Sequence, residues 1–321
     1  MGSPQPDRPA ELVLTAAVAR AYFLDDRSKT DIATEFGLSR FKVARLLDHA
    51  REVGLVRIEL DYQGDLDLDL SARLRAAYSL EHVLVVLAPE NDVVALREHL
   101  SHAAARLLSE IVTATDVLGI AWARSLLALP GALTHLAPCE VVQLTGALGR
   151  LELDDSAVEL VRAVARVARG TAYSFHAPMI LPDEETAASL RRQPEVARTM
   201  TRYPALTKAV LGVGSWQRGQ STVVDAIGAR EWRSLRDLGV RAELSGIQID
   251  GEGRPVDSPL RARSIGISSA QLRAVPEVIA VTSGVEKAGA VRAAIRGGLV
   301  NSLITSTVLA RPLLELAGRD R

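Results

Sequence analysis

The first sixty residues alternate between short helical periods and polar breaks. Apolar residues recur with a helical spacing in three segments, and the breaks between them contain Asp, Ser and Gly residues that end or begin helices. A last segment alternates apolar and polar residues, as a short half-buried strand does. The pattern therefore predicts three helices and a strand, over residues 11–23, 30–36, 39–53 and 55–60.

From residue 71 onward, apolar strand-like runs alternate with amphipathic helical stretches. Strands that alternate with helices indicate a largely parallel sheet covered on both faces. The predicted strands are His82–Ala88, Val117–Ile120, Glu140–Thr145, Thr171–Phe175, Lys208–Val213, Ala242–Ile249, Glu277–Thr282 and Leu299–Ile304. The predicted helices are Val93–Ile111, Ala157–Ala168, Ala229–Leu238, Val285–Arg296 and Thr307–Leu316.

These patterns divide the chain of 321 residues into four parts. The first ten residues are polar and rich in proline, which predicts a disordered N-terminus over 1–10. A small helical domain follows over 11–60. Five acidic residues and no basic one lie between Glu59 and Asp69, which is typical of a solvated connector, so a linker is predicted over 61–70. The α/β domain occupies 71–321.

Composition excludes several classes of protein. With 38 basic and 39 acidic residues the net charge is -1, so only local patches could attract nucleic acid. The single cysteine, Cys139, cannot form an intrachain disulfide. The apolar runs are too short to span a bilayer, and the N-terminus does not resemble a signal peptide. We therefore expect a cytoplasmic protein that does not associate with membranes.

The segment Lys29–Leu47, KTDIATEFGLSRFKVARLL, has the spacing of a helix-turn-helix. Ala33 supplies a small residue where two helices approach, and Gly37 supplies the turn between them. Val43 and Leu46 lie three residues apart on the side of the second helix that faces the first. Residues 55–60 then fit the wing of a winged helix-turn-helix.

The outward side of the second helix is basic. Between Arg27 and Arg57 there are seven basic and four acidic residues, on a chain that is close to neutral overall. Helix N-termini attract phosphate, and Arg or Lys can donate to guanine edges in the major groove. Phe41 can pack on a thymine methyl or on the first helix. The predicted DNA-binding residues are Thr30, Ser39, Arg40, Phe41, Lys42, Arg45 and Arg57.

Several strands of the α/β domain end in small or hydroxyl residues before a helix. In a parallel sheet, ligands bind beyond the carboxyl ends of the strands, where helix N-termini present free N–H groups. Segments of this form begin at Val117, Val141, Leu211 and Val281, and the last contains Lys287, one of only four lysines. Together they predict a binding site for hydroxyl or phosphate groups.

These segments also resemble the SorC family of sugar-responsive transcriptional regulators, over about residues 11–318. The similar stretches are GIAWARSL (119–126), VVQLTGA (141–147), HAPMILP (176–182), AVLGVGSW (209–216), GVRAELSGIQIDGEGRPVD (239–257) and ISSAQLRAVPEVIAVTSGVEKAGAVRAAIRGGLVNSLIT (267–305). The last stretch is the most specific, because it keeps length and order over nearly forty residues.

The resemblance implies a winged helix-turn-helix joined to a doubly wound, mostly parallel, Rossmann-like effector domain related to sugar-phosphate isomerases. It implies operator DNA as a partner, a sugar, polyol or sugar-phosphate effector, and a homodimer or homotetramer. Carried over by position, the effector-binding residues are Gly119, Trp122, Thr145, Gly146, Gly214, Glu243 and Lys287.

The chain departs from the family pattern at several of these positions. Ala123 replaces a usual glycine, Thr145-Gly146-Ala147 replaces Asn-Gly-Gly, and Glu243 replaces an aspartate. With fewer glycines, the backbone loops around the ligand leave less room for a phosphate group. An unphosphorylated sugar or polyol is therefore an alternative effector. Between residues 43 and 207 there is no lysine, which excludes imine formation from that half of the domain.

Two other hypotheses remain. A sugar-phosphate isomerase or deaminase-like enzyme with an accessory helical domain would need a general base, for which Asp225, Glu243 and Glu286 are candidates without a recognisable constellation. An oligomeric scaffold would leave the basic helix unexplained.

His99 and His102 suggest only half of a metal site, so neither a metal nor a cofactor is expected. The prediction is a DNA-binding regulator of a carbohydrate catabolic operon, without catalytic residues.

Overall fold

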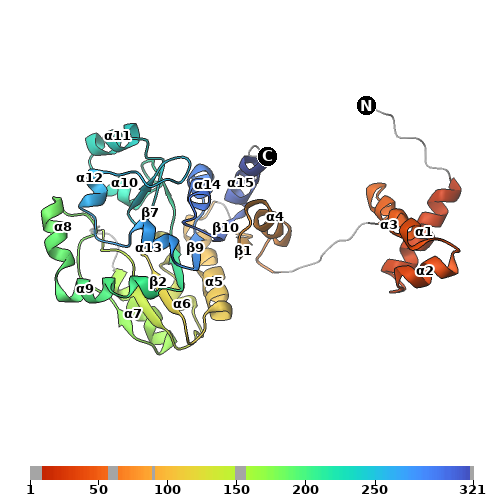
Figure 1. Cartoon of the computed structure of the whole chain (residues 1–321), viewed down its shortest axis with the longest axis horizontal. Coiled ribbons are helices and arrows are strands. Elements are labelled where there is room, and N and C mark those ends of the chain that lie inside the picture. The colour runs from red at the N-terminus through yellow and green to blue at the C-terminus, as the bar shows by residue number, and fades with distance from the viewer. Residues whose placement is uncertain (1–8, 57–63, 89–90, 149–156, 319–321) are drawn as a thin grey trace. The chain divides into compact units, whose positions relative to one another are not determined.

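The computed structural model describes residues 9–56, 64–88, 91–148 and 157–318, and it divides into two compact units (Figure 1). The first unit spans Met1–Gly64 and the second Asp65–Arg321. Within the described residues, no helix is both long and apolar enough to cross a membrane.

The first unit contains helices α1 (Pro9–Phe23), α2 (Lys29–Glu35) and α3 (Arg40–Glu52). Their core is apolar and includes Val18, Ile32, Val43 and Leu46, all nearly inaccessible to solvent. The Oγ atom of Ser39 accepts a hydrogen bond from the backbone N–H of Lys42, 3.1 Å away, and so caps α3 as the sequence predicts.

The turn between α2 and α3 depends on Gly37. Its φ of +64° is easily adopted only by glycine, and it lets the N–H of Leu38 donate to the carbonyl of Ala33, 2.8 Å away. The predicted strand over 55–60 is only partly described: Leu55 and Val56 are not in a strand, and Arg57 and the rest lie outside the described residues.

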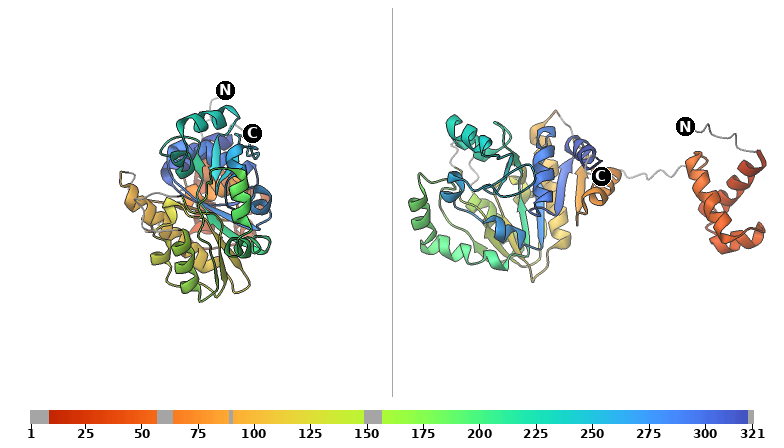
Figure 2. Two further views of the ribbon diagram at one scale, coloured as in Figure 1. Left: turned by 90° about the vertical axis from the view of Figure 1, so that its left-hand side faces the viewer. Right: turned by 45° about the horizontal axis from the view of Figure 1, so that its top comes forward.

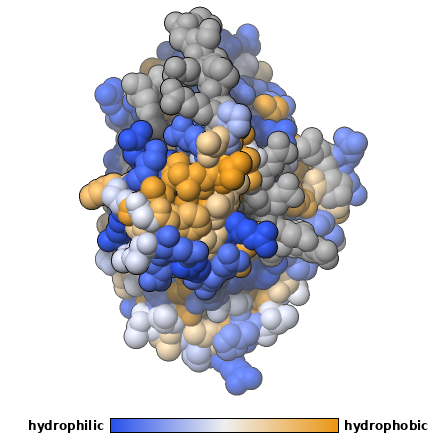
Figure 3. Space-filling view, turned by 90° about the vertical axis from the view of Figure 1, so that its right-hand side faces the viewer, coloured by the Kyte–Doolittle hydropathy of each residue, from blue (hydrophilic) through white to orange (hydrophobic). Residues whose placement is uncertain are grey.

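One face of this unit leaves apolar side chains exposed. Helix α1 buries Val18 and Ala19, yet Val13 on its outer side is 70% exposed and Ala16 is exposed as well. Figure 3 shows one face of the molecule, on which apolar side chains gather in a patch surrounded by hydrophilic ones. A helix that is apolar on both sides is usually covered on both sides.

The second unit is built on a seven-stranded sheet in the order β1-β10-β9-β5-β2-β3-β4, in which every neighbouring pair is parallel. The strands are β1 (Val83–Val86), β2 (Val117–Ile120), β3 (Glu140–Gln143), β4 (Ala172–Tyr173), β5 (Lys208–Leu211), β9 (Glu277–Val281) and β10 (Ser302–Ser306).

Helices cover both faces of this sheet, which confirms the doubly wound architecture (Figure 2). One face packs against α4 (Leu68–Tyr78), α13 (Ser269–Arg273), α14 (Ala288–Arg296) and α15 (Thr307–Gly318). The other packs against α5 (Val93–Ile111), α6 (Leu129–Ala132) and α7 (Ala157–Ala168). Alternate residues of β9 therefore enter different cores, with Val278 on the first side and Ile279 on the second.

The remaining helices lie along the connections. They are α8 (Glu184–Arg191), α9 (Pro194–Met200), α10 (Thr222–Ala226), α11 (Ala229–Asp237) and α12 (Pro259–Ala262), with short 3-10 turns η1 (Arg124–Leu126), η2 (Tyr203–Ala205) and η3 (Val285–Lys287).

The predicted single strand over Ala242–Ile249 is a hairpin instead. Strands β7 (Ala242–Leu244) and β8 (Ile247–Ile249) pair antiparallel around Ser245 and Gly246, which have φ angles of +52° and +77°. Two consecutive positive φ angles make the tight turn that suits the twist of a hairpin. With β6 (Gly214–Ser215), which follows β5, they form a second, small sheet.

Residues 65–70, predicted as linker, belong to the second unit. The carboxylate of Asp65 accepts two 2.8 Å hydrogen bonds from Arg106, and Leu66 forms a bridge with Val86 at the sheet edge. The carboxylate of Asp67 caps α4 by accepting from the N–H of Leu70 at 2.9 Å. These acidic residues thus have structural partners, which the run of like charges does not indicate.

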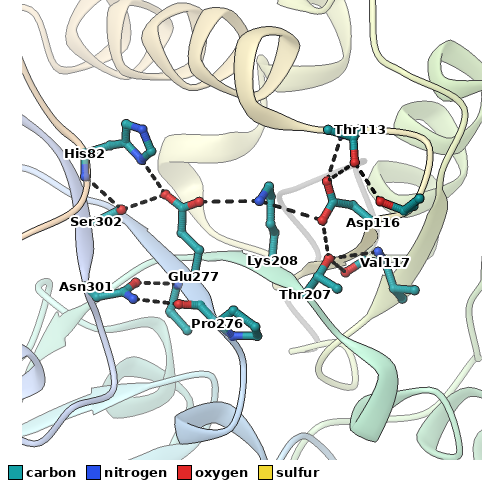
Figure 4. Close-up of polar contacts among 12 residues, drawn as sticks. His82, Thr113, Asp116, Val117, Thr207, Lys208, Pro276, Glu277, Asn301 and Ser302 are labelled. Carbon is teal, nitrogen blue, oxygen red and sulfur yellow. Dashed lines mark hydrogen bonds and ion pairs between the residues drawn. The ribbon is translucent and has the colours of Figure 1, made fainter.

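A polar network joins the amino-terminal ends of the strands (Figure 4). The Nζ atom of Lys208, at the start of β5, lies 3.7 Å from the carboxylate of Asp116 and 3.6 Å from that of Glu277. Glu277 also accepts from Ser302, 2.8 Å away, and contacts His82 at 2.7 Å. One lysine therefore connects three neighbouring strands.

The carboxylate of Asp116 is the most heavily hydrogen-bonded member of this network. It accepts from Thr207 at 2.6 Å and from the N–H and hydroxyl of Thr113 at 2.8 and 2.9 Å. Burial alone would raise the pKa of Asp116, but these hydrogen bonds and the charge of Lys208 lower it below its ordinary value of 3.8.

We predict that Asp116→Asn lowers the free energy of unfolding at pH 7 by about 1–2 kcal/mol, because charge-assisted hydrogen bonds are lost. Since the folded-state pKa is depressed, the carboxylate stabilises the fold above pH 3.8 and loses this effect as pH falls through the folded-state pKa. Denaturant unfolding should therefore show the two proteins converging in acid. Asp237→Asn, at an exposed carboxylate, is the control. A difference that is unchanged at low pH would contradict the prediction.

Candidate functional site

The predicted DNA-binding residues gather around the start of α3. Thr30 on α2 and Arg40, Phe41 and Arg45 on α3 are all exposed. Phe41 is 85% exposed, which excludes the alternative that it packs on the first helix. The first turn of α3 thus exposes Arg40 and an aromatic side chain, and Arg45 follows one turn later.

The basic residues of this unit differ in how far they are engaged. The Nζ atom of Lys42 lies 3.5 Å from the carboxylate of Glu11 on α1, so its charge is partly balanced within the unit. Lys29 lies over the ring of Tyr22. Arg40 and Arg45, in contrast, make no ion pair with the described part of the chain. Arg57 lies outside the described residues.

A cleft of about 680 Å³ opens at the carboxyl ends of β2, β3, β5, β9 and β10, with the small sheet and α10 forming its other side. Strands β2 and β5 lie side by side, and within this sheet the chain continues from β2 to β3 on one side and from β5 to β9 on the other. Such a switch point is where open parallel sheets bind ligands. The cleft contains six of the seven predicted effector residues, namely Trp122, Thr145, Gly146, Gly214, Glu243 and Lys287.

Gly119 is the exception. It lies inside β2, where a Cβ atom would approach the side chain of Leu144 to 2.7 Å and that of Leu206 to 3.0 Å. A glycine at this position allows close packing within the core and does not line the cleft.

Glu243 is the buried carboxylate of the cleft. One of its oxygens accepts from the hydroxyl of Ser221 at 2.8 Å, and the other accepts from the N–H of Gly246 at 3.4 Å. Burial raises the pKa of Glu243, while these hydrogen bonds and the charge of Lys287 oppose the rise. Gly214 makes this arrangement possible, because a Cβ there would lie 2.7 Å from both Glu243 and Ser221.

Three cations line the same cleft. Burial lowers the pKa of Lys287 to about 8, with Glu243 opposing this shift and Arg124 and Arg97 adding to it. Arg124 forms an ion pair with Asp225, with 3.2 Å between the nitrogen and the oxygen. The carboxylate of Asp225 also accepts a hydrogen bond from the N–H of Gly219 at 2.7 Å. The side chains of Arg97, on α5, and Lys287 make no hydrogen bond or ion pair with the described residues.

Two hydroxyl groups in the cleft lack partners. The buried Oγ atoms of Ser245 and Ser306 make no hydrogen bond within the described structure. Buried polar groups are normally hydrogen-bonded, so these atoms are suited to a ligand's hydroxyls. Sequence reasoning missed Arg97, Arg124, Ser221, Ser245 and Ser306, although Arg124 lies beside Trp122 in a motif that it singled out.

The histidine and cysteine candidates have ordinary structural roles. The Nδ1 atoms of His99 and His102 lie 2.8 Å from the carbonyls of Ala95 and Glu98, one turn earlier on α5. Among the described residues, no group of three or more potential ligands could hold a metal ion. Burial raises the pKa of Cys139 to about 11, which disfavours the reactive thiolate.

Comparison with known proteins identifies the class to which this fold and cleft belong. Residues 63–315 match the family described as "Putative sugar-binding domain". The chain is 30% identical over 301 residues to the uncharacterized transcriptional regulator YjhU of Escherichia coli, covering 91% of this chain and 92% of that protein. It is 24% identical to the sorbitol operon regulator of Klebsiella pneumoniae, over 95% and 98% of the two chains.

The fold agrees with these similarities. The crystal structure of the full-length sorbitol operon regulator SorC from Klebsiella pneumoniae superposes with a TM-score of 0.73 and 23% identity, over 95% of this chain and 99% of that one. The chain belongs to the SorC family of sugar-binding transcriptional regulators. The α/β architecture and the family predicted from the sequence are confirmed.

We predict that Gly214→Ala distorts the cleft and lowers the free energy of unfolding by about 1–3 kcal/mol, because the added methyl overlaps Glu243 and Ser221. Gly289→Ala is the matched control, since a Cβ at this helical position meets nothing within 4 Å and alanine favours the helix. Thermal unfolding of both variants would test this, and equal melting temperatures would contradict it.

Proposed function

We propose that this protein controls a carbohydrate catabolic operon, with operator affinity set by a small carbohydrate bound in the cleft. One observation carries the proposal: in a cleft at the switch point of the sheet, the Oγ atoms of Ser245 and Ser306 make no hydrogen bond with the described residues, and the side chains of Arg97 and Lys287 make no ion pair with them. The similarity to the sorbitol operon regulator supports an operon of this kind.

We infer that the effector carries an anionic group as well as hydroxyls. Arg124 is balanced by Asp225, and Lys287 interacts with Glu243, but the guanidinium of Arg97 has no counter-charge among the described residues. A phosphate or carboxylate on the sugar would supply that charge. The shortage of glycines, which favours an unphosphorylated effector, is outweighed in this proposal by the side-chain cations of the cleft.

Binding must also change DNA affinity. A ligand can shift an equilibrium only if it binds two arrangements of the protein with different affinity. Helix-turn-helix proteins commonly bind two half-sites as dimers, and a homodimer or homotetramer fits this requirement. The exposed apolar residue Val13 on α1 supports association of the DNA-binding unit.

We favour binding without turnover over the enzyme alternative. Both carboxylate oxygens of Glu243 accept hydrogen bonds, one from Ser221 and one from Gly246. These hydrogen bonds make Glu243 less available to take a proton from a substrate. Turnover assays on pentose and hexose phosphates test this choice. Multiple turnover that is lost in a Glu243→Gln variant would favour the enzyme.

We predict that Arg45→Ala weakens operator binding by about 1–3 kcal/mol, because an arginine that reaches a base edge contributes this much. Gel-shift titration at fixed salt concentration measures the change. Arg20→Ala, which removes an exposed arginine from α1, is the control. An affinity that is unchanged in the Arg45 variant would remove this residue from the DNA contact.

We predict that Lys287→Ala retains operator binding and loses the effector response. In the wild type, affinity for an anionic effector should fall as pH rises through about 8, because Lys287 then loses its charge. Lys287→Arg should remove that pH dependence, since arginine stays protonated.

Thermal-shift titration with sugars, polyols, sugar phosphates and sugar acids identifies the ligand, because a bound ligand raises the melting temperature further as its concentration rises. A wild-type response in Lys287→Ala would refute the site.

A further inference from the structure

Phe41 is the most exposed large apolar side chain in the described structure. It is 85% accessible to solvent, compared with 75% for Leu24 and 70% for Val13. It lies in the first turn of α3, between Arg40 and Lys42. A ring in this position adds little packing energy to the folded unit, and its surface is accessible to a partner.

The position of Phe41 on α3 indicates that its partner is DNA. Arg45 lies four residues later and therefore on the same side of α3, whereas Val43, Leu46 and Leu47 are buried on the opposite side. One turn beyond Arg45, the exposed side becomes acidic at Asp48. The positive, outward part of α3 is thus its N-terminal half, which is the part that contacts base edges in helix-turn-helix proteins.

The floor of the major groove offers one prominent apolar group. Thymine carries a 5-methyl group there, and phenylalanine is among the side chains that contact it. We propose that Phe41 packs against the methyl of a particular thymine in each operator half-site and so fixes the base at that position. The inference rests on the proposed function, because it requires sequence-specific operator binding.

Deoxyuridine substitution tests the contact one methyl at a time. The full-length protein first selects its preferred duplex from a random pool, and each thymine is then replaced singly by deoxyuridine, which removes only the methyl and keeps base pairing. At one thymine in each half-site, affinity should fall about three- to fivefold, the effect of exposing one methyl group. Other replacements should have no effect at the same salt concentration.

Variants connect that thymine to Phe41. Phe41→Ala should bind the selected duplex more weakly and should bind it equally well with thymine or deoxyuridine at the sensitive position. Leu24→Ala, which removes another highly exposed apolar side chain, outside α3, should keep the full response. Both substitutions remove exposed atoms, so thermal unfolding should match the wild type and exclude misfolding as the cause.

The possible results separate this inference from the proposed function. If the wild type selects a sequence but no deoxyuridine position matters, or if Phe41→Ala keeps the response, Phe41 does not read a methyl group. A loss of affinity without altered methyl dependence would place the ring against another part of the complex and also overturn the inference. If no duplex is bound specifically, the proposed function itself fails.

Discussion

The parallel pairing of the seven strands is the constraint on which the cleft depends. Because every strand runs in the same direction, the loops after β2, β3, β5, β9 and β10 emerge at one edge. Residues such as Trp122, Thr145 and Lys287, which are far apart in the chain, therefore line one cleft. A short segment of the chain could not bring these hydroxyl groups, cations and the buried carboxylate together in one place.

The polar side chains at the two ends of the same sheet differ in how far they are paired. At the amino-terminal end, Lys208, Asp116 and Glu277 satisfy one another and connect the strands (Figure 4). At the carboxyl end, Arg97 and Lys287 have no such partners among the described residues, and Ser306 keeps an unused hydroxyl. Satisfied polar groups stabilise a fold, whereas unsatisfied ones in a cleft are available to a ligand. The same type of side chain is thus held in ion pairs at Lys208 and makes none with the described residues at Lys287, where we propose ligand binding.

Much of the candidate site could be predicted because its signals are local. The cap at Ser39 and the turn at Gly37 need only a few neighbouring residues, and both are observed. Helices over Val93–Ile111 and Ala157–Ala168 have the predicted bounds, since their apolar periods are long and regular. The hairpin over 242–249 was missed because its apolar alternation continues on both sides of the turn.

The two-part organisation, the helix-turn-helix and the alternation of strands and helices could all be predicted, because each follows from periodicity, caps and turns within a short stretch of residues. Tertiary structure decided which residues face the cleft. It placed Gly119 against Leu144 in the core, and it joined Arg124 to Asp225, 101 residues further along the chain. Strand order and close packing create such neighbours, and neither is encoded in the spacing of a single segment.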